Sequence, residues 1–209
     1  MVKLYGKNGA CSMAVHVLLN ELGEKYEYVN AYDAHGKASD ELKALNPLGQ
    51  IPVLVDGDLT LTEGAAIINY LLDKHESPML PKSGSGRAKA LQWLAFANAT
   101  MHPAYGRAFF LKGALGEGAE KEKALKIAAE KINVLWALVD ARLAKQKYVA
   151  GEQFSAADIL LTVIANWTSN VPGTITFGEH VKRLLKEVSA RPAYQKTLTA
   201  EHVEYKAAA

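Results

Sequence analysis

A change of sequence pattern near residue 77 most limits how this chain can fold. Before it, four short strand-like segments alternate with three helix-like segments, in the order β-α-β-α-β-β-α, which implies a sheet covered by helices. From residue 87 onward, apolar residues recur at helical spacing and no strand pattern is found. The segment between them is rich in Pro, Ser and Gly, which is typical of a linker. We therefore predict an α/β domain over residues 1–77, a linker over 78–86 and an all-helical domain over 87–209.

Two local signals refine this outline. Asp56-Gly57-Asp58 separates the last two strand-like segments and predicts a hairpin turn. In the second half, Pro103 lies inside a long apolar stretch and predicts a kink or break in a helix. Ser155 and Asp158 fit a capping box at the start of a nearly all-apolar helix, so we assign them a structural role and no chemistry.

Cys11 is the only cysteine of the chain and lies where the first helix is predicted to begin. Unpaired backbone N–H groups and the positive end of the helix dipole favour the thiolate there, so we predict a lowered pKa. The alternative is a small buried hydrophobe, because free cysteine is among the most buried residue types. From the residues alone, a reactive thiolate and a buried hydrophobic residue are equally supported interpretations of Cys11.

Composition excludes several classes of protein. A formal net charge of +2, with charges of both signs interspersed, gives no electrostatic signature for nucleic acid. A single cysteine excludes a disulfide framework and a cysteine-rich zinc site, and we expect no metal. No signal peptide is visible, and the most apolar stretch is too short to span a bilayer, so we predict no membrane partner and a cytoplasmic location.

Four motifs then occur in order. They are Asn46-Pro47-Leu48-Gly49-Gln50-Ile51-Pro52, Leu61-Thr62-Glu63-Gly64-Ala65-Ala66-Ile67, Ser155-Ala156-Ala157-Asp158 and Ala190-Arg191-Pro192. Together they resemble the glutathione transferases across essentially the whole chain. Gly9-Ala10-Cys11-Ser12 and His102 narrow the resemblance to the bacterial beta class. The resemblance implies the glutathione transferase fold: a thioredoxin-like N-terminal domain that binds glutathione, followed by an all-helical C-terminal domain that forms the pocket for the electrophile.

The resemblance also assigns glutathione contacts in the first domain. The Ile51-Pro52 bond is expected to be cis, with the backbone of Ile51 pairing with the cysteinyl part of glutathione. Otherwise, Pro52 is a trans proline that limits the strand edge. Glu63 is expected to pair with the ammonium group of the ligand and Gly64 to bind its carboxylate through a backbone N–H at the helix start. The plain alternative makes Glu63 a first-turn acid favoured by the helix dipole.

Three further residues are weaker candidates for this site. Gln50 is expected near the tripeptide and is otherwise an exposed loop amide. His35 lies in the loop where family members place a basic group near the glycine carboxylate. Ser12 is the second choice, after Cys11, for contact with the glutathione sulfur.

In the second half, His102 falls where the beta class carries a histidine that faces the glutathione site. A histidine on an apolar helix is otherwise a core or interface residue, and Pro103 after it departs from the pattern of the class. Tyr105, Phe109 and Trp167 are expected to help form the electrophile pocket, although all three also suit the core.

The expected activity is a glutathione transferase that conjugates glutathione to small apolar electrophiles, a detoxification chemistry, with Cys11 and His102 as catalytic residues. Glutathione is the co-substrate, and the resemblance implies a homodimer. One alternative is a glutathione-dependent thiol/disulfide reductase with Cys11 as nucleophile. Another is a protein that binds glutathione or apolar ligands without turnover.

Overall fold

The structure, a computed structural model, describes residues 1–207 and divides into two compact units. The first unit is Met1–Arg87 together with Ala190–Glu204, and the second is Ala88–Ser189 together with the segment that starts at Tyr205. The sequence-based division assigns all of 87–209 to the helical domain, whereas here the last helix belongs to the first unit. The predicted linker also differs, because its last three residues already form the first turn of a helix that starts at Gly84.

The first unit contains a four-stranded sheet in the order β2-β1-β3-β4. Its strands are β1 (Val2–Gly6), β2 (Tyr26–Asn30), β3 (Val53–Asp56) and β4 (Leu59–Thr62). Strand β1 runs parallel to β2 and antiparallel to β3, and β3 pairs with β4 as the predicted hairpin. Gly57 in its turn has φ +61°, a conformation that glycine adopts without a steric cost.

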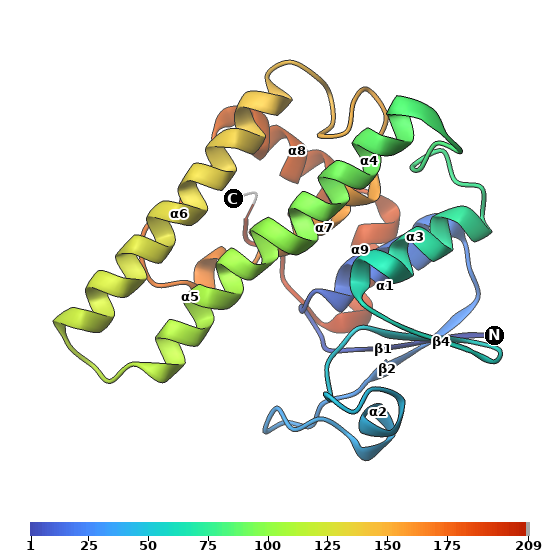
Figure 1. Ribbon diagram of the computed structural model, residues 1–209, viewed down its shortest axis with the longest axis horizontal. Coiled ribbons are helices and arrows are strands. Elements are labelled where there is room, and N and C mark those ends of the chain that lie inside the picture. Colours follow the sequence, from blue (N-terminus) through green and yellow to red (C-terminus); the bar gives the residue numbers. More distant parts are fainter. Residues whose placement is uncertain (208–209) are drawn as a thin grey trace. The chain divides into compact units, whose positions relative to one another are not determined.

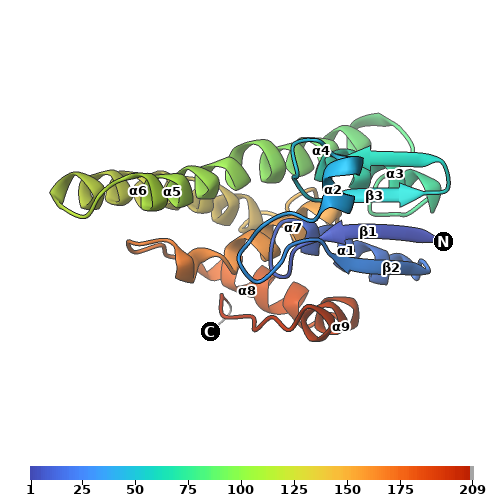
Figure 2. The ribbon, with the colours of Figure 1, turned by 90° about the horizontal axis from the view of Figure 1, so that it is seen from below.

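Four helices complete the first unit. They are α1 (Ser12–Leu22), α2 (Asp40–Leu45), α3 (Gly64–Lys74) and α9 (Pro192–Glu201). Helices α1 and α3 cover one face of the sheet and α2 lies on the other (Figures 1 and 2). On the α2 face, Tyr5 and Val53 pack with Leu42, which agrees with the alternation of side chains along a strand.

Helix α9 packs along α1 because its buried residues recur at helical spacing. Tyr194, Thr197, Leu198 and Glu201 form this buried face. Pro192 opens the helix, as proline does at a first helical position, where no N–H is needed.

The second unit consists of helices joined by loops, and within its described residues it has no strand of the sheet. Its main helices are α4 (Gly84–Phe96), α5 (His102–Ala114), α6 (Ala119–Leu143), α7 (Ala156–Ala165) and α8 (Glu179–Ser189). Every residue of α7 is buried, as the apolar sequence predicts for a central helix.

The helical segment continues through Pro103 without a break. A π-helical turn, Ala97–Met101, joins α4 directly to α5, which begins one residue before Pro103. A proline inside an α-helix lacks an N–H and its ring collides with the carbonyl four residues earlier. The wider π-helical turn accommodates that proline, so the predicted irregularity takes this form and lies directly before His102.

The capping box at α7 is present as predicted. The fully buried Asp158 carboxylate accepts hydrogen bonds from the Ser155 backbone N–H at 2.9 Å and the Ser155 hydroxyl at 2.7 Å. Its other oxygen accepts a third hydrogen bond, at 3.0 Å, from the backbone N–H of Val149. Asp158 thus joins the start of α7 to the preceding loop.

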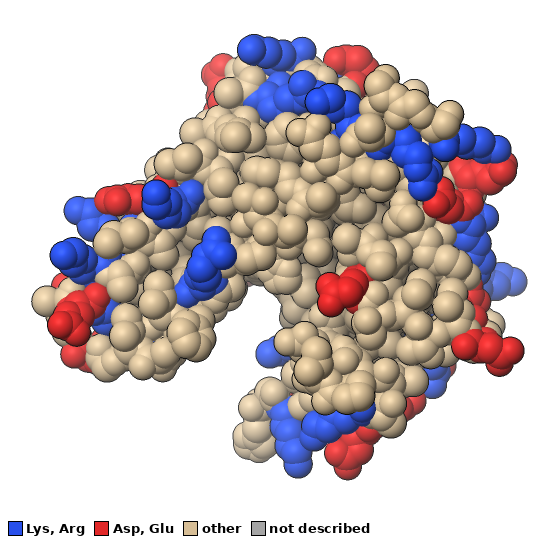
Figure 3. All heavy atoms as spheres, viewed as in Figure 1, with Lys and Arg blue, Asp and Glu red and all other residues tan. Residues whose placement is uncertain are grey.

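Charged residues of both signs are mixed on the surface, as the sequence predicts. Lysine and arginine are interspersed with aspartate and glutamate on the face drawn in Figure 3. Over residues 1–207, no helix combines the length and hydrophobicity needed to cross a membrane.

Candidate functional site

The strand pairing brings several chain segments to one edge of the sheet. Val53 at the start of β3 lies beside Tyr5 near the end of β1 and beside Thr62 at the end of β4. On the other side of β1, Gly6 pairs with Asn30 at the end of β2. The segments that follow β1, β2 and β4, and the one that precedes β3, therefore emerge at the same edge.

Cys11 lies in the first of these segments, immediately before α1. Cys11 as a whole is partly buried, and its thiol donates a weak hydrogen bond to the carbonyl oxygen of Ile51, with Sγ and O 3.7 Å apart. Removal from water raises the pKa of Cys11 to about 11, and the negative charge of Glu63 adds to the rise. The predicted lowering of this pKa is therefore wrong. Backbone N–H groups at the helix start do favour the thiolate, but they do not offset desolvation.

The loop before β3 is fixed by hydrogen bonds that the sequence does not reveal. The Ile51-Pro52 peptide bond is cis, as the resemblance implies. The hydroxyl of Tyr32 donates to the Gly49 carbonyl at 2.6 Å, and the side-chain amide of Asn46 donates to the Gln50 carbonyl at 2.9 Å. Gln50 directly precedes Ile51, and its side chain is exposed.

Glu63 occupies the N-cap position of α3 in an unusual conformation. Its φ of +68° lies in the left-handed region, which costs a non-glycine residue on the order of 1–3 kcal/mol. The exposed Glu63 side chain forms no capping hydrogen bond with the helix. The start of α3 thus presents backbone N–H groups without a side-chain cap, next to a carboxylate.

Ser12 has a structural role in this geometry. Its hydroxyl is fully buried, accepts a hydrogen bond from the backbone N–H of Lys7 at 3.0 Å and donates to the carbonyl of Lys7 at 3.2 Å. A Cβ on Gly6 would lie 2.7 Å from the Ser12 hydroxyl, so the turn also requires that glycine. Both partners of the Ser12 hydroxyl thus belong to the turn that carries Cys11.

His35 lies at the surface of the loop after β2. Its side chain is exposed, and its backbone N–H donates to the Asp33 carboxylate at 2.9 Å. That hydrogen bond shapes the loop and does not direct the imidazole toward Cys11 or Glu63.

In the second unit, the predicted aromatic residues form one cluster. The rings of His102 and Phe109 lie 5.2 Å and 6.2 Å from the ring of Trp167, and burial lowers the pKa of His102. Tyr105 is fully buried, and its hydroxyl is hydrogen-bonded to Thr168 and Trp136. For Tyr105, the structure therefore supports the core alternative, whereas the other three rings remain partly exposed.

The sequence analysis did not predict a buried polar network between His16 of α1 and Glu201 of α9. His16 is hydrogen-bonded through Nδ1 to Glu201 at 2.7 Å and through Nε2 to the Tyr26 hydroxyl at 2.9 Å. The second carboxylate oxygen of Glu201 accepts a hydrogen bond from the Gly9 backbone N–H at 2.8 Å. Helix α9 is thereby joined to the turn that carries Cys11. The signal in the sequence is His16 itself, a polar residue on the apolar side of α1.

Comparisons with known proteins agree with this geometry. Residues 1–73 match the family described as "Glutathione S-transferase, N-terminal domain" and residues 93–192 match "Glutathione S-transferase, C-terminal domain". The chain is 33% identical to glutathione S-transferase GST-4.5 of Xanthomonas campestris pv. campestris, over 93% of this chain and 98% of that protein.

Two solved structures show the same architecture. A sphingomonad glutathione S-transferase complexed with glutathione has a TM-score of 0.81 and 30% identity, covering 97% of this chain and 100% of that one. A bacterial beta-class glutathione S-transferase of Sphingomonas chungbukensis has a TM-score of 0.80 and 27% identity, with coverage of 97% and 100%. Both units match these proteins along their length. The chain therefore belongs to the glutathione S-transferase family, with bacterial beta-class enzymes among its structural relatives.

Proposed function

We propose that this enzyme conjugates glutathione to small apolar electrophiles, with Cys11 beside the glutathione sulfur. The observation that carries the proposal is the arrangement at one sheet edge. There, the thiol of Cys11 contacts the Ile51 carbonyl, and the start of α3 lies uncapped beside the strained Glu63.

Glutathione binds in an extended conformation along this edge. The backbone N–H and C=O of Ile51 pair with its cysteinyl part, as an added strand would. Backbone N–H groups at Gly64 and after it bind the γ-glutamyl carboxylate, and the Glu63 carboxylate binds the ammonium group. Gln50, next to Ile51, contributes its exposed side-chain amide to the tripeptide.

Cys11 acts as a hydrogen-bond donor in this proposal. A thiol with a pKa of about 11 keeps its proton at neutral pH, so its S–H can donate to the glutathione thiolate. The glutathione sulfur forms the C–S bond to the electrophilic carbon, and the leaving group departs with its electron pair. His102 is the proposed acceptor of the glutathione thiol proton, because burial lowers its pKa and leaves the imidazole neutral.

The electrophile binds to the aromatic cluster of the second unit. Phe109 and Trp167 present partly exposed rings, and buried Tyr105 supports them from the core. Flat apolar rings favour an electrophile with an apolar or aromatic body.

The experiment that tests the glutathione site is calorimetric titration of Glu63→Gln with glutathione. Loss of a charge-assisted hydrogen bond of about 1.5–3 kcal/mol should weaken binding at least tenfold. Asp58→Asn is the matched control, because Asp58 is an exposed acid in the β3–β4 turn, at the opposite edge of the sheet. Equal affinity in the native protein and Glu63→Gln would remove the main support for the proposal.

Cys11→Ala separates conjugation from the two alternatives. Conjugation should persist at a reduced rate, because Cys11 donates a hydrogen bond and forms no covalent intermediate. Complete loss of glutathione mixed-disulfide reduction, with conjugation spared, would identify the reductase. Glutathione binding without turnover of any electrophile or disulfide would identify a binding protein.

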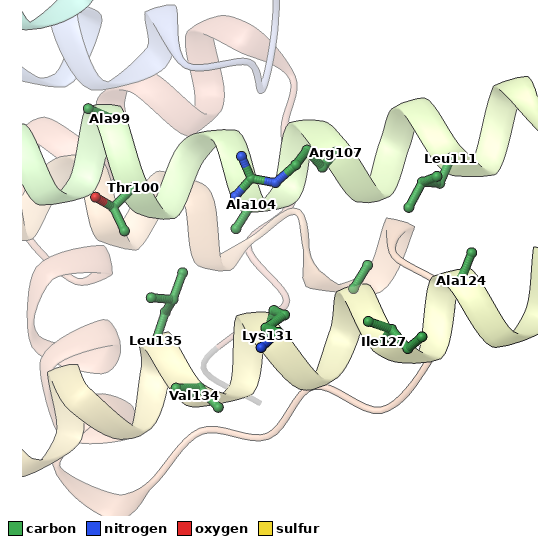
Figure 4. A pocket seen from close by; sticks show the side chains of 11 residues that line it. Ala99, Thr100, Ala104, Arg107, Leu111, Ala124, Ile127, Lys131, Val134 and Leu135 are labelled. Atoms are coloured by element: carbon green, nitrogen blue, oxygen red, sulfur yellow. The ribbon is translucent and has the colours of Figure 1, made fainter.

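We also propose a homodimer that uses a groove between α5 and α6. The groove has a volume of about 440 Å³ and a largely apolar lining, to which Ala104, Leu111 and Leu135 contribute (Figure 4). Along α6, Ile127 and Val134 remain 47% and 65% exposed, and both line this groove. A second copy of the chain would cover them. The cytoplasmic location remains a prediction from the sequence.

A further inference from the structure

We propose that the Asn8-Gly9 peptide is a site of spontaneous deamidation, which helix α9 holds unreactive while it is docked on α1. Asn8 is the only asparagine of the chain that is followed by glycine. In such a pair, the backbone nitrogen of the glycine attacks the side-chain carbonyl carbon of the asparagine, because glycine has no Cβ to restrict the approach. The inference is independent of the proposed function, since it concerns a chemical change of the chain itself.

The reaction consumes only water. The Gly9 nitrogen loses its proton and forms a bond to Cγ of Asn8, and the bond between Cγ and the side-chain nitrogen breaks. That nitrogen leaves as ammonia, with the electron pair of the broken bond and one proton. Water then opens the remaining succinimide ring at either of its carbonyl groups. One product has aspartate at position 8, and the other has isoaspartate, in which the backbone runs through the former side chain.

Both reacting groups of this peptide are held by hydrogen bonds. The Gly9 N–H donates to a carboxylate oxygen of Glu201 at 2.8 Å, and the Tyr28 hydroxyl donates to Oδ1 of Asn8 at 3.0 Å. The attacking nitrogen must give up its hydrogen bond to Glu201 before it can bond to Cγ. A carboxylate in contact with this nitrogen also opposes the negative charge that the nitrogen gains when its proton leaves. Glu201 therefore withholds the nucleophile of the reaction.

The two hydrogen bonds belong to one closed set of contacts that α9 completes. The ring of Tyr28 is stacked on the ring of His16, with their centroids 4.5 Å apart. His16 is hydrogen-bonded to the other carboxylate oxygen of Glu201 at 2.7 Å. Through these contacts, the side chain of Asn8 and the N–H of Gly9 are both joined to the buried pair of His16 and Glu201. The peptide is therefore immobilised only while α9 lies on α1.

The segment after α9 covers the same glycine. A Cβ on Gly9 would lie 3.4 Å from the side chain of Val203, so Val203 lies close beside the peptide. Asn8, in contrast, is exposed to solvent. When α9 leaves α1, the Gly9 nitrogen loses both Glu201 and this cover, while water already surrounds Asn8. The pair then has the freedom that it has in an unfolded chain.

The isoaspartate product cannot restore the native turn. It adds one carbon to the backbone just before Gly9, whereas the backbone of Lys7 stays fixed by two hydrogen bonds to the Ser12 hydroxyl. The Gly9 N–H is thereby moved away from Glu201. Deamidation thus converts a temporary release of α9 into a permanent change of the turn that carries Cys11.

The test measures deamidation of Asn8 by peptide mass spectrometry during incubation in mildly alkaline buffer. The native chain in urea gives the rate without protection, and the folded native protein should react far more slowly. Glu201→Ala should deamidate at Asn8 at least tenfold faster than the native protein, because a charge-assisted hydrogen bond no longer closes the turn. Glu201→Gln keeps an oxygen that accepts from the Gly9 N–H, so it should recover part of the protection.

Asp158→Ala is the matched control for lost stability. It also removes a buried carboxylate, at the start of α7, and leaves the contact between Gly9 and Glu201 in place. Its rate at Asn8 should stay close to that of the native protein. Equal acceleration in Glu201→Ala and Asp158→Ala would show that general unfolding exposes the peptide, and the proposal would be overturned. A native rate equal to the rate in urea would overturn it as well.

A measurement on the native protein covers the case in which Glu201→Ala does not fold. The rate at Asn8 is followed at urea concentrations below the unfolding transition. Release of α9 exposes less surface than unfolding of the whole chain, so the rate should rise only shallowly with urea. A rise as steep as that of global unfolding would mean that α9 does not open by itself, and would contradict the proposal.

Discussion

The thiol of Cys11 lies at a helix start, where unpaired N–H groups favour negative charge, and it is also largely removed from water. Desolvation has the larger effect and raises its pKa to about 11. The unfolded chain ionises this thiol near its ordinary value of ~8.5. Because the folded pKa is higher, the contribution of Cys11 to stability is complete below pH 8.5 and is lost as the pH rises toward 11.

We predict that the ligand-free protein reacts slowly with iodoacetamide at pH 7, because the thiolate is the reactive form. The rate should rise about tenfold per pH unit up to pH 10, without levelling off near 8.5. Intact-protein mass spectrometry over a pH series measures the adduct directly, since the chain has one cysteine. Free cysteine in the same buffers provides the reference, and a plateau near pH 8 would show that the thiol is activated in the absence of ligand.

The positions of the residues in the proposed glutathione site can be read from the sequence, but the environment of these residues cannot. The motifs around Ile51 and Glu63, and the place of Cys11, follow from the order of residues in the chain. The desolvation of Cys11 depends on three segments brought together by the sheet, around residues 11, 51 and 63. No property of the sequence near residue 11 carries that information.

At the scale of single elements, the start of α7 depends on one buried carboxylate. Asp158→Ala removes three hydrogen bonds and leaves the Val149 and Ser155 donors buried. We expect a loss of about 2–4 kcal/mol in the free energy of unfolding. Urea denaturation measures it, with Asp40→Ala as control, because Asp40 is an exposed first-turn acid of α2. An unaltered midpoint with abolished turnover would instead give Asp158 a chemical role.

Helix α9 depends on a second buried carboxylate. Glu201→Ala removes the buried carboxylate that is hydrogen-bonded to His16 and to the Gly9 N–H, so we expect a loss of about 3 kcal/mol in the free energy of unfolding. Lys196→Ala, on the exposed side of the same helix, should have little effect. In a double-mutant cycle, His16→Ala combined with Glu201→Ala should cost less than the sum of the single changes. Strict additivity would mean that the two side chains do not interact.

The elements themselves were largely predictable, since the strands, the hairpin and the capping box follow from local patterns. Two features were not. Pro103 is incompatible with a regular, continuous α-helix, and the π-helical turn before His102 accommodates it. The sequence predicts an irregularity near Pro103 but not that it takes the form of a π-helical turn. The place of α9 depends on which surface its apolar face covers, and the spacing of apolar residues does not identify that partner.

At the scale of the whole molecule, the α5–α6 groove predicts self-association. Val134→Asp adds a charge at an exposed position, so the fold should persist while the dimer weakens by at least tenfold. Sedimentation velocity over a concentration series measures the association, and circular dichroism confirms the helices. Lys186→Glu, an exposed charge change on α8, is the control. A native protein that sediments as a monomer at micromolar concentration would contradict the proposed homodimer.

The return of α9 to the first unit has a consequence for the order in which the protein is made. A ribosome delivers the sheet and α1 first, then Ala88–Ser189 of the second unit, and Glu201 only after that. Until then, His16 and the Gly9 N–H have no carboxylate, and the face of α1 that α9 covers stays in contact with water. Folding from the N-terminus in step with synthesis therefore cannot complete the first unit. The turn that carries Cys11 reaches its final form only after translation has passed residue 201, so a nascent chain stalled before that point carries the Cys11 thiol on an unfinished domain.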